Sequence, residues 1–198
     1  MNSAVLLLLL LDFVLITATP RLFFRAGVLN LRWWLTALPI GLCPLFIVAC
    51  LIAKVGPTVP AGWLTATGLV AVVLFTASVA MVALTIGTHR VPIALWHQPD
   101  DDPQHIVTWG AYQKVRHPFY LAYLLAFGGA LLAFPHWGTL AAFVYMAAML
   151  NSLAAKEEGK LSRSEFGDEY RDYITRTGRF LPLGTGMRRV ERERESVS

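Results

Sequence analysis

The segment with the most potential for chemistry is residues 107–120, V-T-W-G-A-Y-Q-K-V-R-H-P-F-Y, which lies between long apolar runs. Within it, Arg116 and His117 directly precede Pro118, a residue that suits the first turn of a helix. The amino end of a helix favours anions, so a basic pair at this place suits a carboxylate or a phosphate. The ring of Tyr112 could stack on an adenine or face a cation. An alternative is that the basic pair is an ordinary positive flank that anchors a membrane span.

A second polar segment begins where the last apolar run ends, with Lys156, Glu157 and Glu158. Adjacent glutamates commonly form a solvated helix face, and this interpretation stays open. The alternative is that one of them faces a bound cation or accepts hydrogen bonds from a ribose. An amphipathic helix that lies against the membrane or the core is predicted from the spacing of Leu161, Phe166, Tyr170, Tyr173 and Ile174.

The composition indicates an integral membrane protein. Of the 198 residues, 56% are hydrophobic and 15% are charged, whereas soluble domains have about 25% charged residues. The mean hydropathy is +0.53. The basic residues lie between and after the apolar runs, where membrane topology accounts for them. No basic patch interleaved with aromatic residues forms a separate domain, so nucleic acid is not an expected partner.

Five apolar runs predict membrane-spanning helices. They lie at about residues 4–19, 35–53, 63–86, 119–134 and 138–155. The last two are split by the sequence Pro135-His136-Trp137-Gly138 and should form an antiparallel hairpin with a tight turn. The predicted fold class is therefore a single all-α integral membrane domain over residues 1–198. It has five transmembrane helices, a C-terminal helical hairpin and a cytosolic amphipathic helix.

Three features inside these runs carry further predictions. The first run contains one acid, Asp12, and we favour a carboxyl satisfied by a neighbouring helix or lying near a water-filled cavity over a functional group. Pro39 and Pro44 should kink the second span. Cys43 and Cys50 are about 10 Å apart along a helix, too far for a disulfide, and are expected to be small buried residues.

The basic residues also predict how the spans are oriented. Segments 20–32, 87–118 and 156–198 contain 3, 3 and 10 Lys and Arg residues, and the opposite side has only Lys54. Cytoplasmic loops carry the excess of Lys and Arg, so the N-terminus is expected outside and the C-terminus in the cytosol. The segment around Arg116 and the charged segment after residue 156 then lie on one face and can meet.

Together, the two polar segments resemble the isoprenylcysteine carboxyl methyltransferase family, which is related to the phospholipid N-methyltransferases. The pattern of that family is roughly T-x-G-x-Y-x-x-x-R-H-P-x-Y, then E-E, then F-G-x-x-Y-x-x-Y and R-F-x-P. The first part is matched by Thr108, Gly110, Tyr112, Arg116, His117, Pro118 and Tyr120. The rest is matched by Glu157, Glu158, Phe166, Gly167, Tyr170, Tyr173, Arg179, Phe180 and Pro182. The resemblance covers about residues 104–183. The chain departs from it at Ala122, where glycine is frequent, and at Ala154 and Ala155, where a basic residue is common.

The resemblance implies S-adenosyl-L-methionine bound at the cytosolic face between residues 104–120 and 156–182. It also implies a lipophilic acceptor that enters sideways from the bilayer. Methyl transfer from a sulfonium is an in-line displacement, for which positioning supplies much of the rate. The catalytic candidates are Arg116, His117 and Glu158. The cofactor-binding candidates are His105, Gly110, Tyr112, His117, Pro118, Tyr120, Glu157 and Glu158, and the substrate-binding candidates are Arg179 and Tyr170.

Alternatives stay open for the acceptor atom and for the class of function. A carboxylate acceptor needs no base, whereas an amine, phenol or thiol must lose a proton, for which His117, His105 or a glutamate is a candidate. A membrane lipid reductase that uses NADPH could share the small multi-span architecture, although no nicotinamide-binding motif supports it. A non-enzymatic transporter is disfavoured because the polar groups cluster at one face. The expected partners are membrane lipids and a lipophilic substrate, with no obligatory protein partner evident. No metal site is expected, since no thiol or paired histidine supports the loop histidines.

Overall fold

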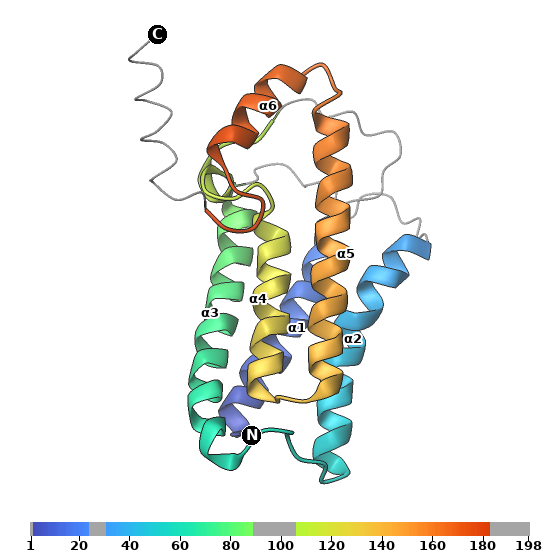
Figure 1. Cartoon of the computed structure of the whole chain (residues 1–198), viewed down its shortest axis with the longest axis vertical. Helices are drawn as coiled ribbons and strands as arrows, with labels where there is room; N and C mark the ends of the chain where they lie inside the picture. The colour runs from blue at the N-terminus through green and yellow to red at the C-terminus, as the bar shows by residue number, and fades with distance from the viewer. Residues whose placement is uncertain (1, 24–30, 89–105, 183–198) are drawn as a thin grey trace.

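The computed structural model describes residues 2–23, 31–88 and 106–182, and the side chains of 2–17, 38–88 and 106–182. All regular elements in these ranges are helical, as the sequence predicts. The α-helices are α1 (Ser3–Phe23), α2 (Leu31–Ile52), α3 (Leu64–Thr88), α4 (Pro118–Ala133), α5 (Trp137–Leu161) and α6 (Gly167–Arg176). Two short 3-10 turns, η1 (Ala61–Trp63) and η2 (Gly110–Gln113), precede α3 and α4. Figure 1 shows α1 to α5 side by side along the long axis, with α6 at the end opposite to the start of α1.

Two of these helices are long and apolar enough to cross a membrane. Within the described residues they are Ala61–Thr88 and Trp137–Leu161, and only 28% and 22% of their most apolar stretches are buried inside the protein. The shorter apolar helices are Ser3–Thr17, Leu38–Ile52 and Pro118–Ala133. Large apolar side chains point outward from several helices, among them Leu7, Leu45, Val73 and Val144. A soluble protein rarely exposes so much apolar surface, so this outer face suits an apolar solvent.

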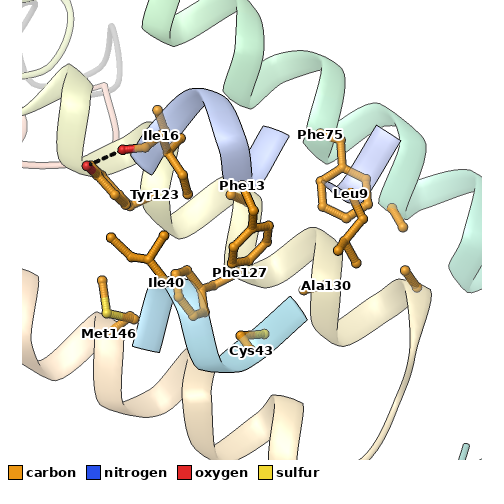
Figure 2. Packing of buried hydrophobic residues seen from close by; sticks show 14 of the residues in the cluster. Leu9, Phe13, Ile16, Ile40, Cys43, Phe75, Tyr123, Phe127, Ala130 and Met146 are labelled. Atoms are coloured by element: carbon orange, nitrogen blue, oxygen red, sulfur yellow. Dashed lines mark hydrogen bonds between the residues drawn. The ribbon is translucent and has the colours of Figure 1, made fainter. Parts of the chain in front are cut away.

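The core is built where α1, α3 and α4 meet. Figure 2 shows Phe13 of α1 against Phe127 of α4, with ring centroids 5.1 Å apart in an edge-to-face arrangement. Close approach of α3 requires glycine at position 129, because a Cβ there would lie 2.7 Å from the ring of Phe75. At the neighbouring Gly128 the nearest atom would be 3.5 Å away, an ordinary contact. Gly129 is thus a packing residue, because only a small residue lets the two helices approach this closely.

Asp12 is fully buried, and its Oδ1 lies against the Ser78 hydroxyl of α3, so a neighbouring helix satisfies one carboxyl oxygen, whereas Oδ2 has no hydrogen-bond partner among the described residues. Ser78 Oγ is 2.9 Å from Asp12 Oδ1 and 3.0 Å from the carbonyl oxygen of Ala122. A hydroxyl has one hydrogen, so it can donate to only one of these two oxygens. The two contacts can both be hydrogen bonds if Asp12 is a neutral acid. Asp12 then donates to Ser78, and Ser78 donates to the carbonyl of Ala122. The three residues then join α1, α3 and α4 through a relay of two bonds.

The end of the bundle away from α6 is tied by backbone contacts between connections. Thr58, between α2 and α3, donates from its amide to the carbonyl of Pro135, between α4 and α5, over 2.8 Å. His136 caps α5 and accepts from the amide of Gly138 over 3.2 Å. At α2, Pro39 and Pro44 lie inside a helix that bends along its length (Figure 1), in line with the predicted kink.

The predicted runs and the helices agree in type and differ in extent. All five apolar runs are helical, but α5 continues past residue 155 to Leu161, so Glu157 and Glu158 are on its polar last turn. Pro118 is the first residue of α4, the position its fixed backbone angle favours. Cys43 and Cys50 are buried and free, as predicted.

Candidate functional site

The two polar segments are joined first by their main chains. Val115 forms an isolated parallel bridge with Gly178. The amide of Arg116 donates to the carbonyl of Gly178 over 2.8 Å, and the amide of His117 donates to that of Arg179 over 3.1 Å. The residues just before α4 are therefore fastened to the residues just after α6. This contact confirms the expectation that the segment around Arg116 and the charged segment after residue 156 meet.

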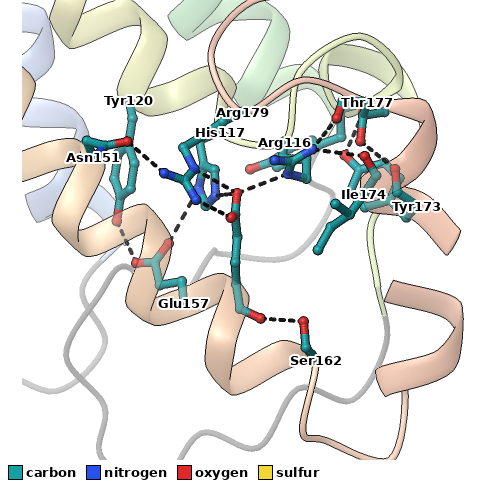
Figure 3. A network of polar contacts seen from close by, with 12 residues as sticks. Arg116, His117, Tyr120, Asn151, Glu157, Ser162, Tyr173, Ile174, Thr177 and Arg179 are labelled. Atoms are coloured by element: carbon teal, nitrogen blue, oxygen red, sulfur yellow. Dashed lines mark hydrogen bonds and ion pairs between the residues drawn. The ribbon is translucent and has the colours of Figure 1, made fainter. Parts of the chain in front are cut away.

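Glu158, on the last turn of α5, is the centre of the side-chain contacts. Figure 3 shows Arg116, His117 and Arg179, which bond to it, gathered in one place. Its Oε1 accepts from Arg116 Nε over 2.9 Å, and its Oε2 accepts from Arg179 Nη2 over 2.6 Å. The Nε2 atom of His117 is 3.2 Å from Oε1. Burial by itself would raise the pKa of Glu158, but the hydrogen bonds from these three basic partners outweigh it and hold the pKa below the usual glutamate range. A charged carboxylate thus orders three basic side chains.

Most of the hydrogen bonds of Arg116 connect α4, α5 and the end of α6. Its side chain is 10% exposed, and its Nη1 donates to the backbone carbonyls of Ile174 and Thr177 at the end of α6. The last carbonyls of a helix lack partners within the helix, and a basic side chain supplies them here. Arg116 therefore clamps α6 against α5, and its catalytic role stays a prediction.

His117 lies between two carboxylates and against a tyrosine ring. Its Nδ1 is 3.5 Å from Glu157 Oε2, while its Nε2 faces Glu158. The imidazole stacks on Tyr120, with the ring planes 4° apart and the centroids 5.3 Å apart. Tyr120 donates its hydroxyl to Glu157 Oε1 over 2.5 Å. This arrangement fixes the plane of the imidazole and places a group that can exchange protons beside two carboxylates.

Gly110 allows the backbone conformation of the loop before α4. Its φ is +61°, a conformation that side chains disfavour, and a Cβ there would lie within 2.3 Å of Thr88 Oγ1. The same hydroxyl oxygen accepts from the amide of Ala111 over 3.1 Å. The glycine thus lets the loop close onto the end of α3. Its match to the family pattern has a local structural reason that does not depend on a ligand.

A small aromatic cluster supports the site from the side of α6. Tyr170 and Tyr173 are buried together with Ile106. Tyr173 donates its hydroxyl to the carbonyl of Tyr112 over 2.6 Å. Burial raises the pKa of Tyr173 to about 12, so its phenol stays neutral. The cluster anchors the loop that precedes α4 to α6, so Tyr112 and Tyr170 lie beside the carboxylate network as part of its support.

Most of the site residues predicted from sequence gather in one network. The side chains in it are Arg116, His117, Tyr120, Glu157, Glu158 and Arg179. Pro118 starts α4 directly behind them. His105 lies outside the described residues. The sequence analysis missed Asn151, whose amide oxygen accepts from Arg179 Nη1 over 2.7 Å. The available signal was a lone amide in an otherwise apolar run.

The network has no metal-binding character in the described part of the chain, where no group of three His, Cys, Asp or Glu side chains could hold an ion. A comparison with known families and with curated proteins found no match to the chain. Function must therefore be argued from the chemistry of the site.

Proposed function

We propose that the protein is a methyltransferase that uses S-adenosyl-L-methionine and acts on a lipophilic acceptor at the cytosolic face of a membrane. The observation that carries this proposal is the contact of Arg116 and His117 with Glu157 and Glu158 at one end of an apolar helical bundle. The resemblance of these segments to the isoprenylcysteine carboxyl methyltransferase family supplies the reaction. The isoprenylcysteine-like carboxylate or another lipid or isoprenoid acceptor would be the substrate.

The proposal includes a membrane topology. In it, α1 to α5 all cross the bilayer, α4 and α5 form the C-terminal hairpin, and α6 lies on the cytosolic surface. The strong excess of Lys and Arg on one side of the predicted spans supports this arrangement, with the N-terminus outside. The exposed apolar side chains along the bundle support it as well, because lipid tails would cover them.

Glu157 has an oxygen that can still accept a hydrogen bond from the cofactor. When bound, S-adenosyl-L-methionine supplies an electrophilic methyl group on a sulfonium. Glu157 is 36% exposed, and its Oε2 has His117 Nδ1 at 3.5 Å and no closer donor among the described residues. That oxygen can accept from a ribose hydroxyl or an ammonium group. Glu158, by contrast, already accepts from both guanidiniums, so it orients the site and does not need to touch the ligand.

His117 is the residue best placed for proton transfer. For an amine, phenol or thiol acceptor it can take a proton, and the two carboxylates beside it stabilise the imidazolium that results. For a carboxylate acceptor no base is needed, and His117 and its partners contribute position and exclusion of water. The stack with Tyr120 keeps the ring in one plane in either case.

The test is a calorimetric titration of the full chain in detergent with S-adenosylhomocysteine, the product form of the cofactor. We expect saturable binding that Glu157→Gln weakens several-fold, because the variant keeps the size of the side chain but loses its charge. Asp168→Asn, a change at an exposed ion pair on α6, is the matched control and should bind as the natural chain does. No heat above background with the natural chain would refute the proposal. Difference spectra that instead show NADPH binding would favour a membrane lipid reductase.

A further inference from the structure

Asp12 is a fully buried acid that the proposed reaction does not use. It lies in the middle of α1, against Ser78 of α3, and Ser78 in turn contacts Ala122 of α4. Among the described residues, the polar side chain in contact with Asp12 is that of Ser78, which carries no charge. A carboxylate among apolar side chains needs a partner that neutralises it, and an acid inside an apolar helix marks a possible functional site. The contacts around Asp12 indicate which partner this is.

Two arrangements account for the contacts of the Ser78 hydroxyl, which has one hydrogen and two oxygens within reach. In the first, Asp12 is a neutral acid that donates from Oδ1 to Ser78. In the second, Asp12 is charged and a cation lies between its carboxylate and the lone pairs of Ser78. Ser78 then donates its hydrogen to the carbonyl of Ala122 over 3.0 Å. The 2.9 Å between Ser78 Oγ and Asp12 Oδ1 then separates two oxygens that share one cation.

The second carboxyl oxygen of Asp12 distinguishes the two arrangements. Oδ2 is buried and has no hydrogen-bond partner among the described residues. A neutral acid that donates from Oδ1 leaves Oδ2 as a buried acceptor without a donor, which is unfavourable. A cation held by both carboxylate oxygens uses Oδ2 as a ligand, so each polar side-chain atom of the cluster has a partner. The unpartnered oxygen therefore favours the arrangement with a cation.

We propose that Asp12 and Ser78 bind a small monovalent cation, of which sodium is the candidate, in the core between α1 and α3. One carboxylate neutralises one positive charge, whereas a divalent cation would leave a net charge among apolar side chains. Calcium also takes about 6–8 oxygen ligands, more than this cluster supplies. Carboxylate and hydroxyl oxygens are hard ligands, which suit a hard cation. The bound cation would tie the two helices together and stabilise the fold, whatever reaction the carboxylate network performs.

Further polar atoms lie next to this cluster on the side of α6. Tyr123 donates its hydroxyl to the carbonyl of Ile16 over 2.9 Å (Figure 2). Ile16 is one turn after Asp12, about 6 Å along α1. Since α1 starts at the end of the bundle opposite to α6 (Figure 1), this turn leads toward α6. The polar atoms thus continue from Asp12 in the direction from which a hydrated cation would enter.

The experiment compares the Tm of the full chain in detergent in sodium chloride and in choline chloride of equal concentration. Choline is too large for a site between packed helices, so there a proton neutralises Asp12. We expect sodium to raise Tm by about 5–11 °C at about 100 times its Kd. Asp12→Asn should lose this shift, yet melt close to the natural chain in choline chloride because its NH₂ can donate to Ser78. Asp168→Asn, which removes an exposed acid, is the matched control and should keep the shift.

Each outcome supports or overturns the cation site. Equal Tm values of the natural chain in the two salts at every concentration would overturn it and leave Asp12 a neutral acid. A sodium shift that survives in Asp12→Asn would place the cation elsewhere in the protein. Should Asp12→Asn fail to fold, Ser78→Ala keeps the carboxylate but removes the hydroxyl ligand, and an undiminished shift there would contradict the assigned ligands. An equal shift with magnesium chloride would contradict a monovalent site. None of these measurements involves S-adenosylhomocysteine, so the methyltransferase proposal can fail while the cation site stands.

Discussion

Replacing Glu158 by glutamine should destabilise the end of the helical bundle at which α6 lies. The substitution keeps the shape of the side chain but removes the charge that Arg116 and Arg179 share. It also places an amide NH₂ group, a donor, where one of the guanidiniums donates now. The Glu158 side chain is 10% exposed, so solvent screens these contacts little. Removing one partner from a buried charge pair costs about 3–5 kcal/mol, and we expect a loss in that range.

The buried thiols of Cys43 and Cys50 provide the assay, because a maleimide dye that fluoresces on reaction labels them only as the protein unfolds. In proteins of 150–250 residues, 1 kcal/mol corresponds to about 2–4 °C, so Glu158→Gln should lower Tm by about 6–20 °C. Asp168→Asn is the control, since that carboxylate is fully exposed in its pair with Arg171 and its loss should leave Tm unchanged. Equal Tm values for the two variants would refute the central role given to Glu158.

Three further predictions use the same measurement. Gly129→Ala should cost about 1–3 kcal/mol through overpacking, whereas Gly128→Ala, with room for its methyl group, should melt close to the natural chain; similar melting of both would contradict the packing argument. Asp12→Asn should be tolerated because its NH₂ can donate to Ser78, while Asp12→Leu should cost about 1–3 kcal/mol; equal losses would rule out a neutral acid at this position. The stabilisation from Glu158, whose pKa is lowered on folding, should be fully present above its ordinary pKa of 4.5 and decline as the pH falls below it. The Tm difference between the natural chain and Glu158→Gln should therefore shrink in acid, and a difference that grows there would reverse the assigned sign.

The sequence predicts the helices and the meeting of the two polar segments because both follow from local rules. Long apolar runs form helices, and Pro118 marks the start of α4 since its ring suits the first turn. The excess of basic residues on one side predicts that Arg116 and Glu158 share a face. Their bond at 2.9 Å agrees with that reasoning.

The roles inside the site depend on tertiary geometry and could not be read in advance. A basic residue before a span looks the same whether it binds a ligand or, as Arg116 does, the end of another helix. Gly110 matches a family pattern, yet its backbone angle and the nearby Thr88 explain it without a ligand. Asn151 is a single amide in an apolar run, and only the path of the chain after α6 brings Arg179 to it.

The bridge between Val115 and Gly178 has a consequence for biosynthesis. All the long apolar segments leave the ribosome before residue 178 does, so they can form their helices while the network is still incomplete. At that stage Glu158 has neither Arg179 nor the strand-like pairing that sets Arg116 in place. The polar centre is therefore completed last, and a chain truncated before this point would keep its apolar helices but lack the ordered network.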